Sequence, residues 1–181
     1  MMRYLIALLL TLPLLLAAGP LQSSQKIRRV GEWETPPTVV LCDTETVSKE
    51  NLKLILRWWE ELGYEFGQTV VSPTHRGCSG NVGGTITITR TGLGANTLFL
   101  EREEKLRWAK VKLPRNTPNL ILAHEIGHAL GWTHTRSSNH IMNGRYSEAG
   151  WFSGGLQIGS PRAFPGARGP RRGGSAAGRG R

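Results

Sequence analysis

Two apolar stripes at helical spacing organise this chain. The first follows Ser48, a good helix-capping residue, and stops at Gly63, which ends helices readily; its members are Leu52, Ile55, Leu56, Trp59 and Leu62. The second predicts a helix over residues 118–130, with Thr117 as N-cap and Pro118 in the first turn; its apolar members are Leu120, Ile121, Ala123, Ile126, Ala129 and Leu130. The pattern therefore predicts two main helices, each with an apolar surface to bury.

Strand patterns precede the first stripe and fill the stretch between the two. The clearest is the alternating run TITITR at residues 85–90, and apolar or β-branched runs predict further strands at residues 38–42, 65–71, 98–101 and 108–113. The order of strand, helix, several strands and a second helix predicts an α+β domain. We expect residues 98–101 to form the sheet edge to which an extended peptide could add main-chain hydrogen bonds.

The two ends of the chain differ in composition from its middle. Residues 1–19 have a short basic start and an apolar core too short for a comfortable membrane span, so they predict a secretory signal peptide, with an uncleaved anchor as the alternative. Residues 20–35 are polar and predict a linker or a short pro-segment. Residues 36–153 are then the folded domain, and residues 154–181, rich in Gly, Pro, Ala, Ser and Arg, predict a disordered basic tail.

The net charge of +10 belongs mainly to the ends of the chain. Residues 36–153 hold 13 basic and 11 acidic side chains, whereas residues 154–181 hold six arginines and no acidic side chain. The domain itself is therefore nearly neutral. We expect a monomer with no specific nucleic-acid partner and no stable membrane span in the mature chain. The tail could serve as a cationic arm, but a solvated tail without a specific partner is the preferred interpretation.

Cys42 and Cys78 are the only two cysteines and lack the close spacing of a zinc-binding pair. An even number in an exported chain predicts a disulfide, which would close a loop of about 35 residues. Two free, buried thiols remain the alternative in a reducing compartment.

The candidate chemistry lies in the run HEIGHALGWTH at residues 124–134. His124 and His128 are four residues apart, so one helix face can aim both imidazoles at one metal ion. Gly131 can take a left-handed conformation that turns the chain and brings back His134 as a third ligand. Three protein ligands leave a zinc position open for water, and Glu125 is placed to take a proton from that water.

This run resembles the signature of the metzincin metalloproteases, and the following residues are most similar to the matrixin branch, the matrix-metalloprotease-like proteins. Met142 stands where the resemblance implies a Met-containing turn beneath the metal. Tyr146, four residues later, matches a residue in the wall of the S1′ specificity pocket; Gly144 replaces the usual proline between them, and Thr135 replaces the usual serine after the third histidine.

The resemblance implies a metzincin-like zincin catalytic domain with a twisted mixed sheet, two main helices and one catalytic Zn²⁺. Few residues follow Tyr146 before the tail, so the C-terminal subdomain is expected to be reduced, with Trp151 and Phe152 against the metal helix. His75 and His140 are expected to be exposed loop histidines outside the site. The predicted function is that of a secreted zinc endopeptidase acting on proteins or peptides, and the alternative is a zinc-binding module with little or no turnover.

Overall fold

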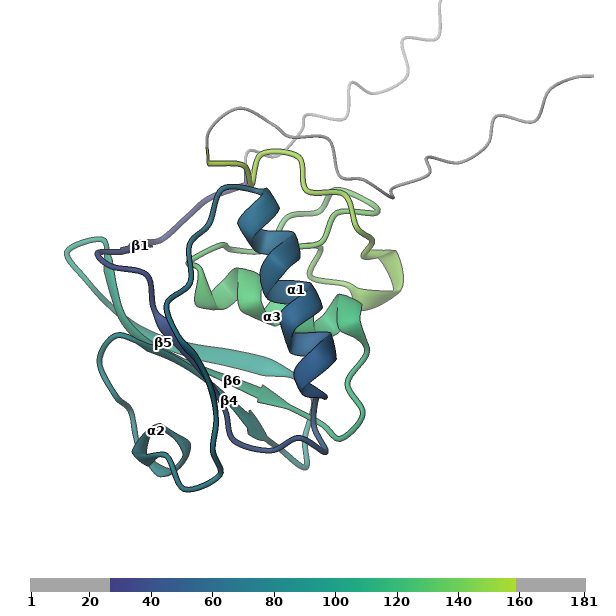
Figure 1. The fold of residues 1–181 in the computed structure, drawn as a ribbon. Helices are drawn as coiled ribbons and strands as arrows, with labels where there is room; N and C mark the ends of the chain where they lie inside the picture. The colour runs from purple at the N-terminus through teal and green to yellow at the C-terminus, as the bar shows by residue number, and fades with distance from the viewer. Residues whose placement is uncertain (1–26, 159–181) are drawn as a thin grey trace, which may run out of the picture.

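The computed structural model describes residues 27–158 as one sheet with two helices packed on the same side of it (Figure 1). The elements in chain order are β1 (Glu32–Trp33), β2 (Thr38–Leu41), α1 (Lys49–Glu61), β3 (Thr69–Val71), α2 (Arg76–Ser79), β4 (Thr85–Arg90), β5 (Asn96–Arg102), β6 (Lys105–Leu113), α3 (Asn119–Ala129) and the 3₁₀ turn η1 (Tyr146–Glu148). The predicted α+β fold with two main helices is confirmed. The predicted signal peptide and most of the predicted tail lie outside the described residues.

The sheet is mixed, as expected. Its order is β1-β6-β4-β2-β3 with all of these strands parallel, while β5 pairs with β6 in the antiparallel sense. Within residues 27–158, β5 pairs with β6 alone, so its other side is an open edge. The expected edge strand is therefore an edge, although it is longer than residues 98–101.

The first apolar stripe forms the core face of α1. Ser48 caps the helix, its hydroxyl accepting a hydrogen bond from the Asn51 N–H at 3.1 Å. The stripe residues are buried, and the indole of Trp59 donates to the Ala123 carbonyl at 3.1 Å, which joins α1 to α3. Both helices bury against the inward-facing Ile86, Ile88 and Val111 of the sheet.

The ordered fold begins earlier than the predicted boundary at residue 36. Residues 27–34 pack along the end of α3: Val30 N–H donates to the Gly131 carbonyl at 2.8 Å, and the Trp33 indole donates to the Ala129 carbonyl at 3.0 Å. β1 also pairs with the first residues of β6. This stretch is polar in sequence because it lies at the surface, yet its backbone belongs to the domain.

The ordered fold also continues beyond residue 153, where the tail was expected to begin. Leu156 is fully buried, and its carbonyl accepts a hydrogen bond from the Tyr64 hydroxyl at 2.6 Å. Ile158 N–H donates to the Leu62 carbonyl at 2.8 Å. One apolar side chain in a Gly-rich stretch therefore anchors the end of the domain to the end of α1.

The C-terminal subdomain is reduced, as expected, to loops, isolated bridges and η1. The expectation that Trp151 and Phe152 pack against the metal helix is not met. Trp151 lies edge-on to Trp58 of α1, with ring centroids 5.5 Å apart, and Phe152 lies edge-on to His140 at 5.7 Å. Across the described part of the chain, no helix combines the length and apolar character that crossing a bilayer requires.

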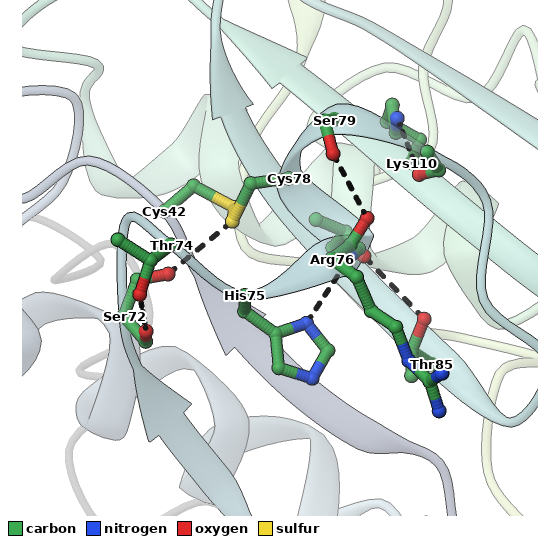
Figure 2. The surroundings of a disulfide bond; sticks show 12 residues. Cys42, Ser72, Thr74, His75, Arg76, Cys78, Ser79, Thr85 and Lys110 are labelled. Carbon is green, nitrogen blue, oxygen red and sulfur yellow. Dashed lines mark hydrogen bonds between the residues drawn. A yellow bond between two sulfur atoms is a disulfide. The ribbon is translucent and has the colours of Figure 1, made fainter.

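Cys42 and Cys78 form a disulfide, which joins the end of β2 to the loop that carries α2 (Figure 2). In the same loop His75 is not a free surface histidine: its Nδ1 accepts the Gly77 N–H at 3.0 Å and caps α2. This part of the structure is held by local hydrogen bonds and one covalent link rather than by a large apolar contact.

Removing the disulfide should destabilise the domain. The bond spans 36 positions in the sequence, and a loop of that size contributes about 2–4 kcal/mol by restricting the unfolded chain. We expect urea denaturation of the Cys42→Ala/Cys78→Ala variant to show a free energy of unfolding lower by about that amount, matched by the reduced parent protein. Equal unfolding midpoints for parent and variant would contradict a stabilising role.

Candidate metal centre

Helix α3 carries His124, Glu125 and His128, and its start differs from the prediction. The helix begins at Asn119, and the Thr117 hydroxyl donates to the Pro114 carbonyl at 2.7 Å instead of capping it. Most of the helix is buried, because α1 and the sheet cover it on two sides. Its ligands are therefore fixed to a rigid element in the middle of the core.

The end of α3 is a turn that only glycine accommodates well. Gly131 has φ of +93°, as its predicted left-handed role requires. Its N–H donates to the His128 carbonyl at 2.9 Å, and Trp132 N–H donates to the Gly127 carbonyl at 3.0 Å, the paired bonds of a Schellman motif. A Cβ on Gly131 would also overlap the carbonyl oxygen of Gly31, which passes directly against the turn.

The turn returns the chain so that three imidazole nitrogens meet at one point. The Nε2 atom of His124 lies 3.1 Å from that of His128 and 3.2 Å from that of His134, and the last two are 3.0 Å apart. Three nitrogens bound tetrahedrally to one zinc ion at about 2.0–2.1 Å would lie about 3.3 Å from one another. The set therefore has the size that a zinc ion requires, and these three residues form a group able to hold a metal ion.

The opposite nitrogens of two of these rings fix which atoms face the metal. Nδ1 of His124 lies 2.7 Å from the Ile141 carbonyl, and Nδ1 of His128 lies 2.7 Å from the Trp132 carbonyl. A carbonyl oxygen can only accept, so each Nδ1 carries the proton and each Nε2 presents a lone pair. Lone pairs that face one another at about 3 Å repel, and a bound cation removes that repulsion.

Burial keeps the two helix histidines neutral. Burial lowers the pKa of His124 to about 4, and the nearby charge of a protonated His128 contributes a second, smaller part of that shift. Burial likewise lowers the pKa of His128. Both rings are thus neutral at neutral pH, with Nε2 unprotonated, which is the form that binds a metal ion without first releasing a proton.

Two hydroxyl groups hold the carboxylate of Glu125 beside these nitrogens. Tyr146 donates to Oε1 at 2.6 Å, and Thr97 of β5 donates to Oε2 at 2.6 Å. Burial, and then the hydrogen bond to Glu125, raise the pKa of Tyr146, so its phenol remains a donor. Sequence reasoning proposed Tyr146 as a pocket wall and did not single out Thr97, because a threonine in an edge strand carries no motif.

Met142 lies under the site, fully buried, as the resemblance implied. Its sulfur occupies the space that a side chain on Gly127 would need: a Cβ at Gly127 would overlap Met142 Sδ and lie 3.0 Å from Trp59 Cζ2. Gly144, which stands in place of the usual proline, lies against the third ligand, since a Cβ there would be 3.1 Å from two atoms of the His134 ring. Small residues thus let the turn approach the helix and His134.

His140 is the clearest error of the sequence analysis. It is buried rather than exposed: its Nδ1 accepts the Met142 N–H at 2.9 Å, and its Nε2 donates to the Gly154 carbonyl at 3.0 Å. Burial lowers the pKa of His140. A neutral imidazole inside the turn therefore shapes the backbone around Met142, and no sequence motif predicts this role.

Residues 77–153 match the family model Peptidase_M10, described as Matrixin, and this range contains every residue of the site. The resemblance drawn from HEIGHALGWTH and Met142 is confirmed by that match. No curated protein sequence matches the chain.

Replacing Gly127 by Ala should destabilise the domain although alanine favours helices. The added methyl overlaps Met142, and overpacking of this kind costs about 1–3 kcal/mol, more than the roughly 1 kcal/mol that helix propensity returns. Thermal unfolding of Gly127→Ala, Met142→Ala and the double variant measures this coupling. We expect Gly127→Ala to be destabilising alone and less destabilising when Met142 is already Ala, since only the contact with Trp59 then remains. Additive effects would contradict the packing argument.

Proposed function

We propose that this chain, whose residues 77–153 match the matrixin family model, is an active zinc endopeptidase with Glu125 as the general base. The observation that carries the proposal is the convergence of three imidazole Nε2 atoms, two of them on α3, with the carboxylate of Glu125 on that helix. His124, His128 and His134 would hold one zinc ion. Met142 would pack beneath the site and would not be a ligand of the zinc ion.

A zinc ion held there would supply the Lewis acidity that activates water and polarises a peptide carbonyl. Glu125 is placed to accept the proton of the attacking water and to pass it to the leaving amine. Each carboxylate oxygen has two lone pairs and uses one for a hydroxyl, so a lone pair remains on each for this transfer.

The open edge of β5 supports a peptide as substrate. An extended chain can add main-chain hydrogen bonds along this edge. Because the edge is open along its length, a bound peptide can continue beyond it at both ends, as the substrate of an endopeptidase must. Phe99 lies two residues from Thr97, on the same face of the strand, and is 36% exposed. Phe99 and the half-exposed ring of Tyr146 are our candidates for contacts with substrate side chains, Tyr146 as part of the S1′ wall.

We further propose that residues 1–19 direct secretion, that the catalytic domain acts as a monomer, and that the basic tail has no specific nucleic-acid partner. The Cys42–Cys78 disulfide supports export, because such bonds persist in oxidising compartments. The second candidate function is a zinc-binding module with little or no turnover. The observation that favours it is the reduced C-terminal subdomain, with Tyr146 bonded to the general base.

Glu125→Gln separates catalysis from metal binding. Glutamine keeps the shape of the side chain but cannot accept the proton, so we expect cleavage of an internally quenched peptide to fall by about 10²–10⁴-fold. Zinc content, measured by mass spectrometry, should stay at one per chain. Glu60→Gln, on the exposed face of α1, is the matched control and should retain full activity. A zinc-loaded Glu125→Gln protein that cleaves normally would rule out this base.

Removing the metal should abolish cleavage and lower stability together. A ligand that binds only the folded chain stabilises it by about 2.7 kcal/mol at a hundredfold excess over its Kd. We expect dialysis against a chelator to lower the unfolding temperature, and one equivalent of zinc to restore both temperature and activity. His128→Ala should show neither response, and a recovered unfolding temperature without any peptide cleavage would favour the binding-module alternative.

A further inference from the structure

Thr97 is the one described side chain that joins the edge strand to the carboxylate of Glu125. Its hydroxyl lies 2.6 Å from Oε2 and 3.0 Å from the backbone oxygen of the same residue. The hydroxyl has a single proton and both neighbours accept, so the shorter distance to the charged oxygen marks the carboxylate as the main acceptor. One hydroxyl therefore contacts both the carboxylate and the backbone of Glu125.

We propose that Thr97 is a positioning residue, which fixes the carboxylate of Glu125 in the orientation that proton transfer requires. This inference rests on the proposed function of Glu125 as general base. A glutamate has three rotatable side-chain bonds, and contacts at both its carboxylate and its backbone restrict them together. A general base must lie within hydrogen-bond reach of the proton that it removes, so this restriction acts directly on the rate.

The two hydroxyls that bind Glu125 differ in how firmly they are held. Thr97 lies within β5, opposite the fully buried Val111 of β6, and its β-branched side chain has few accessible rotamers. Tyr146 lies at the start of a three-residue 3₁₀ turn and is 41% exposed. Thr97 therefore supplies the fixed contact, while the phenol of Tyr146 can give way to an incoming substrate.

The location of Thr97 links substrate binding to the orientation of the base. A peptide that pairs with the open edge of β5 would order the same strand that carries this hydroxyl. Thr97 acts on the proton-transfer step through Glu125, so its loss should lower kcat and leave KM nearly unchanged.

The test compares Thr97→Val, which keeps the shape and removes the hydroxyl, with Thr97→Ser, which keeps the hydroxyl, in the full zinc-loaded chain. Thr89→Val on β4 is the matched control, because the Thr89 hydroxyl makes no hydrogen bond with the described residues. We expect Thr97→Val to lower kcat on a quenched peptide by about 10- to 100-fold with KM within about twofold. Thr97→Ser should recover most of kcat, and Thr89→Val should match the parent.

Crystal structures of the same zinc-loaded proteins give a readout that does not depend on turnover. In Thr97→Val the Glu125 carboxylate should move by about 1 Å or occupy two conformers, and in Thr97→Ser it should keep one position. An unmoved carboxylate in Thr97→Val, or an unchanged kcat, overturns the inference and leaves the proposed function intact. A parent protein that cleaves no peptide refutes the proposed function, and the crystal structures still decide whether Thr97 positions Glu125.

Discussion

The site depends on two hydrogen bonds that point away from it. The Ile141 and Trp132 carbonyls take the Nδ1 protons of His124 and His128, and this choice of tautomer turns both Nε2 lone pairs toward one point. Neither carbonyl lies in α3. One belongs to the Met-containing turn and the other to the turn after Gly131, so the ligand geometry is correct only when both turns are folded against the helix.

The turn after Gly131 is held by residues 28–31, which pass over it. The backbone of residues 28–31 binds Gly131 and Thr133, and the carbonyl of Gly31 leaves no room for a side chain at position 131. The Arg29 guanidinium donates to the Leu130 carbonyl at 3.0 Å and lies over the ring of Trp132. The N-terminal segment thus supports the metal centre by holding the turn after Gly131, although it supplies no candidate ligand.

The sequence sufficed to predict the elements with strong periodicity and the residues within the motif. Helical spacing located both helices to within about two residues at each end, and the spacing of His124, His128 and Gly131 required the observed turn. The contacts of Thr97 and His140 could not be predicted, because each depends on which distant backbone or side-chain atom the fold places opposite it. The same holds for residues 27–35, where a polar composition conceals a strand that main-chain hydrogen bonds join to the sheet and to the end of α3.

A reduced C-terminal subdomain raises the question of what keeps Met142 and Tyr146 in place without a final helix. The structure answers it with a few buried contacts. His140 binds backbone on both sides, at Met142 and Gly154, while Leu156 enters the core beside Tyr64, whose hydroxyl also accepts the Trp132 indole N–H. These links tie the Met-containing turn, the end of α1 and the turn before His134 to one another. Neutral, hydrogen-bonded polar groups therefore hold these segments together where an apolar interface would otherwise be needed. A buried network in which every member is bonded can define a single arrangement with little hydrophobic area.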